Sequence, residues 1–125
     1  MVGKMRRIFL VPLFYIFATT TAMAGEPVIV GGHADLDPCG YGVIAGSTAN
    51  VAVRNGPSSS AAKIEDLPRG VSVWGCDFKN GWHGIVYSRS GQDCRLSSPI
   101  PIARSYRGAC KSGWIPKEAY RLLAG

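Results

Sequence analysis

Residues 51–82, VAVRNGPSSSAAKIEDLPRGVSVWGCDFKNGW, decide the fold of this chain. Alternation in residues 51–54 predicts a short β-strand, because successive side chains of a strand point to opposite faces. Pro57 has no amide hydrogen to give to a strand ladder, so this strand is expected to end before it. The small polar residues that follow predict a loop over residues 58–67, and a short helix over residues 61–67 is the alternative.

A hairpin is predicted at the end of this stretch. Residues 71–74 and 85–87 have the pattern of its two strands, and Asn80-Gly81 is a strong signal for a tight hairpin turn. By alternation, one face of the hairpin is expected to fill the core. The residues on that face are Val71, Val73, Ile85 and Tyr87.

Residues 1–24 are typical of a secretory signal peptide. Basic residues precede an apolar run over residues 8–18, and Ala22-Met23-Ala24 is a small-residue site, so we expect cleavage after Ala24. The run is shorter than the roughly 20 apolar residues of a membrane-spanning helix. An uncleaved anchor is the alternative, but we expect no stable membrane anchor. Sec-type export to a periplasmic or secreted location is expected.

The charge of the chain argues against a nucleic-acid partner. The net charge is +6, but three of the 14 basic residues lie in the expected leader, which leaves 11 Lys and Arg against 8 Asp and Glu. No run of basic residues remains after the leader, so no nucleic-acid binding is expected. The 101 residues that follow the leader are enough for one domain, and we expect a monomer.

The cysteines predict a disulfide framework. All four of them, Cys39, Cys76, Cys94 and Cys110, follow the leader. An even number in a small exported domain predicts two disulfides, for which three pairings are possible. Zinc ligation or a catalytic thiol would be the alternatives, but the chain lacks C-x-x-C and H-x-x-x-H spacing and has only two histidines. We therefore expect no metal and no cofactor.

The order of these features resembles the bacterial SH3 (SH3b) domains, which are small β-barrels used outside the cytoplasm as binding modules. The matching features are the first strand with its Asn-Gly-Pro break, the apolar-x-x-Gly turn at residues 67–70, the hairpin with Asn-Gly-Trp, and a Gly-Trp-Ile segment at residues 113–115. In the family, a single turn and a last short strand often follow that segment. The resemblance covers residues 49–123. It implies an all-β, SH3-like barrel of about five to six short strands, stapled by two disulfides.

Residues 88–111 depart from the family pattern, because most SH3b domains have only a short connection there. A loop of this length in a compact domain is either functional or tethered. We predict that a Cys94–Cys110 disulfide closes it, which leaves Cys39–Cys76 to hold an N-terminal extended arm, residues 25–48, to the central hairpin. Loop entropy assigns about 3 kcal/mol to the first bond and about 4 kcal/mol to the second.

The chain has no recognisable catalytic pattern, and we expect no enzyme. Cys76 and His83 are the sharpest candidates for a nucleophile and its base, but a disulfide at Cys76 would remove the thiol. His33 with Asp35 and Asp37 resembles part of a metal site, but no fourth ligand is evident, and side chains of this kind in an extended arm are more often simply solvated.

Binding is the class of function that the aromatic residues favour. In SH3-type folds, aromatic side chains at the hairpin corner and in the neighbouring loop line the ligand groove. By this resemblance the candidate ligand contacts are Trp82, His83, Tyr106 and Trp114. For Trp114 the alternative is a position in the core or at the closure of the barrel, which is the more usual role of such a tryptophan. Arg104 and Arg107, beside Tyr106, could meet a carboxylate of a peptide or of the cell wall.

The sequence therefore predicts a non-catalytic, exported, SH3b-like module that binds peptide or peptidoglycan in the cell envelope. The alternative is a small secreted inhibitor or effector that presents residues 94–110 to a protein partner.

Overall fold

The computed structural model describes residues 3, 10–15 and 25–124. Most of the expected signal peptide, including its cleavage site, lies outside the described residues. The described chain is all-β, and its one helical element is a short 3-10 turn. The elements are β1 (Ile29–Val30), β2 (Gly40–Ile44), β3 (Asn50–Arg54), β4 (Lys63–Pro68), β5 (Ser72–Lys79), β6 (Trp82–Tyr87), β7 (Arg104–Ser105), β8 (Lys111–Pro116), η1 (Lys117–Ala119) and β9 (Tyr120–Ala124).

Seven of these strands form one antiparallel sheet, and two form a separate ribbon. The order across the sheet is β4-β3-β8-β6-β5-β2-β9, and the ribbon pairs β1 with β7. Among the described residues the edge strands β4 and β9 do not pair with each other, so the sheet is not closed into a barrel. The predicted all-β class is confirmed. There are more strands than expected, because residues 25–48 contribute β1 and β2 and residues 88–111 contribute β7.

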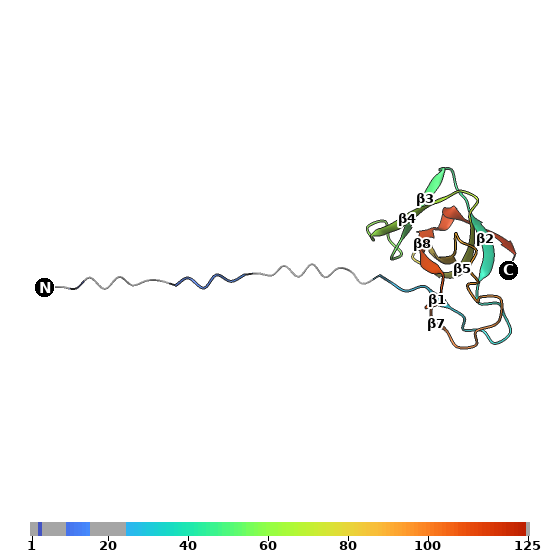
Figure 1. Ribbon diagram of the computed structural model, residues 1–125, viewed down its shortest axis with the longest axis horizontal. Coiled ribbons are helices and arrows are strands. Elements are labelled where there is room, and N and C mark those ends of the chain that lie inside the picture. The colour runs from blue at the N-terminus through green and yellow to red at the C-terminus, as the bar shows by residue number, and fades with distance from the viewer. Residues whose placement is uncertain (1–2, 4–9, 16–24, 125) are drawn as a thin grey trace.

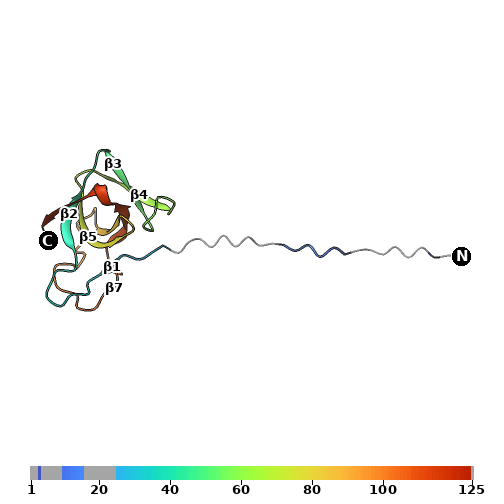
Figure 2. The same cartoon turned by 180° about the vertical axis from the view of Figure 1, so that it is seen from behind.

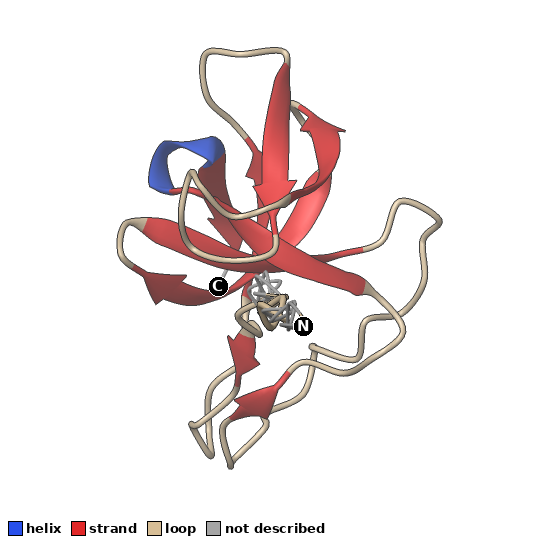
Figure 3. Cartoon of the chain, turned by 90° about the vertical axis from the view of Figure 1, so that its left-hand side faces the viewer, coloured by secondary structure: helices blue, strands red, loops and turns tan. Residues whose placement is uncertain are grey.

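The sheet bends over on itself around a first core (Figures 1 and 3). A single residue pair, Arg54 with Trp114, joins β3 to β8, so the β3–β4 hairpin can turn toward the other strands. Side chains from both halves of the sheet meet in this core. Its buried residues are Ile44, Val51, Val53, Leu67, Val73, Ile85, Tyr87, Ile115 and Ala119.

The predicted hairpin is β5–β6, and its turn is confirmed. Lys79 pairs with Trp82 across the turn, and Asn80 and Gly81 have φ angles of 54° and 82°. Positive φ at both central residues is the type I′ geometry, whose twist matches that of the flanking strands. The strands are longer than predicted, because pairing continues through an irregularity that follows Gly75.

The predicted core face of this hairpin also agrees with the structure. Val73, Ile85 and Tyr87 are at most 1% exposed, and Val71 packs against the same core while partly buried.

The predicted loop is confirmed for residues 58–62, but its continuation through residues 63–67, as a loop or a short helix, is wrong, because residues 63–68 form β4. β4 pairs with β3 from Asn50↔Pro68 to Arg54↔Lys63. Leu67 is the one buried side chain of this strand, so the segment lacks the alternation that identifies a half-buried strand. The available edge of β3 supplies the hydrogen bonds instead, and Pro68 is tolerated because β4 is an edge strand.

A second core lies on the other face of the sheet. Residues 25–39 and 88–110 cover this face, and their strands β1 and β7 lie side by side in Figures 1 and 2. Strand residues that point away from the first core meet residues of these two segments there. The buried members are Val28, Val30, Cys39, Val86, Cys94, Leu96 and Trp114.

Both predicted disulfide pairings are confirmed, and they hold this outer layer in place. Cys39 is bonded to Cys76, and Cys94 is bonded to Cys110. The Trp114 indole N–H donates a hydrogen bond of 2.8 Å to the carbonyl of Glu26. The N-terminal segment is therefore part of the fold, and its strand β2 lies inside the sheet between β5 and β9.

The C-terminal segment has the order that the resemblance implied. β8 contains the Gly-Trp-Ile motif, η1 is the single turn, and β9 is the last short strand.

Two disulfides in a domain of this size indicate an oxidising, extracellular environment. No helix in the described part of the chain has the length and apolar character needed to cross a membrane.

Candidate functional site

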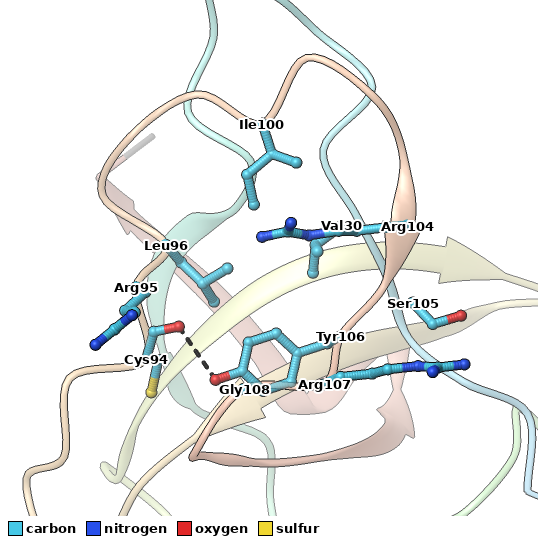
Figure 4. A pocket seen from close by; sticks show the side chains of 10 residues that line it. All are labelled: Val30, Cys94, Arg95, Leu96, Ile100, Arg104, Ser105, Tyr106, Arg107 and Gly108. Atoms are coloured by element: carbon cyan, nitrogen blue, oxygen red, sulfur yellow. Dashed lines mark hydrogen bonds between the residues drawn. The ribbon is translucent and has the colours of Figure 1, made fainter.

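A cavity of about 500 Å³ lies between β1 and residues 94–108, and we call it the insertion cavity (Figure 4). Its volume is within the usual range for small-ligand sites. The residues that line it are Val30, Cys94, Arg95, Leu96, Ile100, Arg104, Ser105, Tyr106, Arg107 and Gly108.

The walls of the insertion cavity are apolar. Val30 and Leu96 are 1% and 2% exposed, so they belong to the second core and present only a small surface to the cavity. Ile100 and the ring of Tyr106 add further apolar surface. A ligand that enters the cavity therefore needs an apolar part.

The cavity is held open by contacts between the two segments that form it. β1 pairs with β7, and the N–H of Gly32 donates to the carbonyl of Ile100 at 2.9 Å. A Cβ atom at Gly31 would lie 2.5 Å from the oxygen of Ile100, so this close approach requires glycine, which also has a φ of 82°. The site is preformed, and binding would cost little ordering entropy.

Tyr106 anchors one wall through its hydroxyl group. The hydroxyl donates to the Cys94 carbonyl at 3.1 Å and accepts from the Cys110 amide at 3.3 Å. Both partners are disulfide-bonded to each other, so the tyrosine bridges the loop that the disulfide closes. Its hydroxyl is thus occupied, and the ring is what Tyr106 offers to a ligand.

Three arginines surround the cavity without ion-pair partners. Among the described residues every ion pair is made by a lysine, at Lys63, Lys79 and Lys111. Arg104 reaches over the cavity between Ile100 and Tyr106, whereas Arg95 and Arg107 lie toward its two sides (Figure 4). The cavity is therefore electropositive as well as apolar.

Arg95 has an unusual backbone. Its φ angle is 58°, in the left-handed region that residues with a side chain rarely adopt. The Asp93 carboxylate accepts a hydrogen bond from the Arg95 amide at 2.8 Å and supports this conformation. Such backbone strain is often found at ligand-binding sites.

Of the four predicted ligand contacts, only Tyr106 lines this cavity. Trp82 is half-buried and packs against the second core. His83, the next residue of β6, points to the opposite face, where its ring lies 5.0 Å from that of Phe78 and 4.7 Å from that of Tyr120. Burial lowers the pKa of His83. Trp82 and His83 therefore do not form one groove.

Trp114 is corrected from a candidate ligand contact to a core residue. Its side chain is 0% exposed, and its indole N–H is already bonded to the Glu26 carbonyl. The position between two cores explains this aromatic residue, because β8 is covered on both faces.

The catalytic and metal alternatives have little geometric support. Cys76 carries no thiol, because it is bonded to Cys39. His33, Asp35 and Asp37 are exposed. Within the described residues no group of three or more His, Cys, Asp or Glu side chains gathers at a site that could hold a metal ion.

A second cavity, of about 520 Å³, lies between Glu26, Asn80 and residues 55–62. This is the corner at which the resemblance places a ligand groove. Small residues and backbone line it, and its one ionised side chain, Glu26, is paired with Lys79. The insertion cavity has the stronger side-chain chemistry for recognition.

The sequence reasoning missed several residues of the insertion cavity. It singled out Tyr106, Arg104 and Arg107, but not Leu96, Ile100 or Arg95. The sequence feature that could have identified them is their position between two cysteines expected to be bonded, because a disulfide-closed loop holds its residues near one another.

No family model, no curated protein and no solved structure matches the chain. Its function must therefore be inferred from its own residues.

Proposed function

We propose that this protein is a non-catalytic, exported binding module that recognises peptide or peptidoglycan through the insertion cavity. The observation that carries the proposal is a preformed apolar cavity surrounded by arginines that lack ion-pair partners within the described chain. Binding sites of this kind combine apolar walls with a few polar groups that orient the ligand.

The order of the elements supports a relationship to SH3b domains. A β3–β4 hairpin, a central β5–β6 hairpin with Asn-Gly-Trp, and the β8–η1–β9 ending follow one another as the resemblance implies. The open edges of the sheet and the outer layer would be departures of this chain from the simple barrel.

The leader and the disulfides support a location in the cell envelope. A basic start, an apolar run and an A-x-A site precede the folded domain. A periplasmic or secreted location would supply the oxidising conditions that both disulfides require.

A pulldown of the purified, oxidised protein on peptidoglycan sacculi tests this function. We expect the wild type to be retained, and Ile100→Trp to be retained at least about fivefold less, because the Ile100 side chain points into the cavity and a larger one would fill it (Figure 4). Ser60→Phe is the matched control, since Ser60 lines the second cavity. It should bind like the wild type.

The reverse pattern, with Ser60→Phe defective and Ile100→Trp unaffected, would move the site to the second cavity. A wild type that is not retained would remove peptidoglycan as the ligand.

The alternative, an inhibitor or effector that contacts a protein partner, has one observation in its favour. Ile102 is 82% exposed in the proline-containing part of the disulfide-closed loop. A side chain on a loop that a rigid scaffold holds in place is available to a protein partner. In this case Ile102→Asp would weaken the complex, whereas sacculus binding through the cavity would not respond to it.

A further inference from the structure

We infer that the insertion cavity receives the free α-carboxylate at the end of a peptide chain, with an apolar terminal side chain beside it, and that Arg104 binds the carboxylate. This inference rests on the proposed binding function and specifies the chemistry of its ligand.

The charge of the cavity favours an anion as the ligand. Arg95, Arg104 and Arg107 are exposed, and no carboxylate of the described chain lies within ion-pair distance of them. The acidic residue nearest to them in sequence is Asp93, and its carboxylate is bonded to the Arg95 backbone amide rather than to a guanidinium. A bound anion would supply the missing partner.

Among the polar groups at the site, Arg104 is the one placed to bind this anion. The Tyr106 hydroxyl is occupied by Cys94 and Cys110, so it has no donor left for a ligand. Arg104 is the arginine whose side chain reaches over the cavity (Figure 4). Its guanidinium has parallel N–H groups that match the two oxygens of a carboxylate.

The apolar walls favour the carboxyl end of a peptide over a polyanion as the ligand. Val30, Leu96 and Ile100 surround the space that Arg104 reaches, so one cationic group and an aliphatic surface face the same ligand. An α-carboxylate next to an aliphatic side chain has this pair of features. A polymer of phosphates would need a longer basic stripe, and the chain has no run of Lys or Arg after residue 24.

The test compares free acids with amides in two sources of peptide chain ends. One is peptidoglycan sacculi before and after amidation of their carboxyl groups with methylamine. The other is a pool of short fluorescent peptides that end in Ala, Val, Leu, Ile or Phe, made as free acids and as C-terminal amides. We expect the free acids to bind at least about tenfold more tightly in one source or both.

Variants of the arginine assign the preference to Arg104. Arg104→Gln should lose the preference for the free acid. Arg104→Lys should keep only part of it, because lysine retains the positive charge but lacks the paired N–H groups of the guanidinium. Arg121→Gln, on exposed β9 and outside the cavity lining, is the matched control and should behave like the wild type. Circular dichroism checks that each variant is folded.

The outcomes separate the two proposals. Equal binding of acids and amides, or an unchanged preference in Arg104→Gln, would overturn the carboxylate inference while leaving a binding module. Absence of binding to both sacculi and peptides would overturn the proposed function and this inference with it. A preference seen in sacculi alone would assign the ligand to the cell wall, and one seen in peptides alone would assign it to protein C-termini.

Discussion

At the scale of single residues, the side chain of Tyr87 shows how the first core accommodates a polar group. Tyr87 is 1% exposed, and its hydroxyl donates to the Glu65 carboxylate at 2.5 Å. Lys111 pairs with the same carboxylate at 3.2 Å. The carboxylate thus stabilises the one polar atom that Tyr87 brings to the edge of the core.

This contact predicts a loss of stability in acid. The hydrogen bond from Tyr87, assisted by Lys111, lowers the pKa of Glu65 below its ordinary value of 4.5, although partial burial opposes the shift. A carboxyl group whose pKa is lower in the folded than in the unfolded protein stabilises the fold at every pH above its unfolded-state pKa. This stabilisation is lost as the pH falls through the folded-state pKa. Urea titrations at pH 7 and at about pH 3.5 should show a smaller acid loss in Glu65→Gln than in the wild type.

Two variants complete this test. Tyr87→Phe should lower the free energy of unfolding at pH 7 by about 1.5 kcal/mol, as expected for a hydrogen bond to a charged group. Asp66→Asn is the control, because Asp66 is half-exposed and pairs only with Lys63 on the same strand. An acid loss equal in Glu65→Gln and the wild type would show that other groups cause it.

At the scale of elements, β9 joins the sheet through Tyr120 and a set of glycines. The Tyr120 hydroxyl donates to the Gly40 carbonyl at 2.8 Å. Cβ atoms built at Gly42 and Gly75 would each lie 2.5 Å from carbons of its ring. Because Gly42 of β2 and Gly75 of β5 have no side chains, the Tyr120 ring has space to cover one end of the first core.

Gly75→Ala should consequently displace Tyr120 and destabilise the protein by about 1–3 kcal/mol, which is the usual cost of overpacking. Chemical denaturation measures the change. Gly56→Ala is the matched control, because its Cβ would meet Ala61 at 3.5 Å, an ordinary contact. In a Tyr120→Ala background the cost of Gly75→Ala should shrink. An undiminished cost would mean that the tyrosine ring is not what the new methyl group meets.

At the scale of the whole molecule, two layers share the central sheet. Strands bent around the first core form one layer, and residues 25–39 with residues 88–110 form the other (Figure 3). The insertion cavity lies within the second layer, so its shape depends on how firmly that layer is tied.

Replacing Cys94 and Cys110 together with serine should lower the free energy of unfolding by about 3 kcal/mol, because the open loop regains entropy in the unfolded chain. Hydrogen exchange should accelerate at the amides of β1 and β7 more than at those of β6, which is central in the main sheet. Retention of the variant on sacculi should also fall, because the residues that line the insertion cavity would be less ordered.

Serine at both Cys39 and Cys76 is the comparison, since that bond ties the arm near β5 and lies outside the cavity lining. Its loss should cost about 4 kcal/mol. Equal acceleration of exchange in β6 and β7 after loss of Cys94–Cys110 would show that the two layers unfold as one unit.

Local chemistry was sufficient to predict part of this fold and part of the candidate site. Asn80-Gly81 determined the hairpin turn, because few residues other than Asn and Gly adopt positive φ at both positions. Alternation placed Val73, Ile85 and Tyr87 in the core. The cysteine count, with the length of the insertion, led to both disulfides. Tyr106, a ligand contact predicted from the resemblance, lies with Arg104 and Arg107 in the lining of the insertion cavity.

Only the tertiary structure decided the remainder. β4 forms because β3 has an edge to pair with, which its own composition does not indicate. Trp114 is buried because distant segments cover both faces of β8. Pairing with β8 extends β6 back to Trp82, three residues before the predicted strand, so Trp82 and His83 point in opposite directions. The insertion cavity requires residues 30 and 94–108 to meet. Such contacts between distant segments depend on the packing of the whole chain, and local patterns carry no information about them.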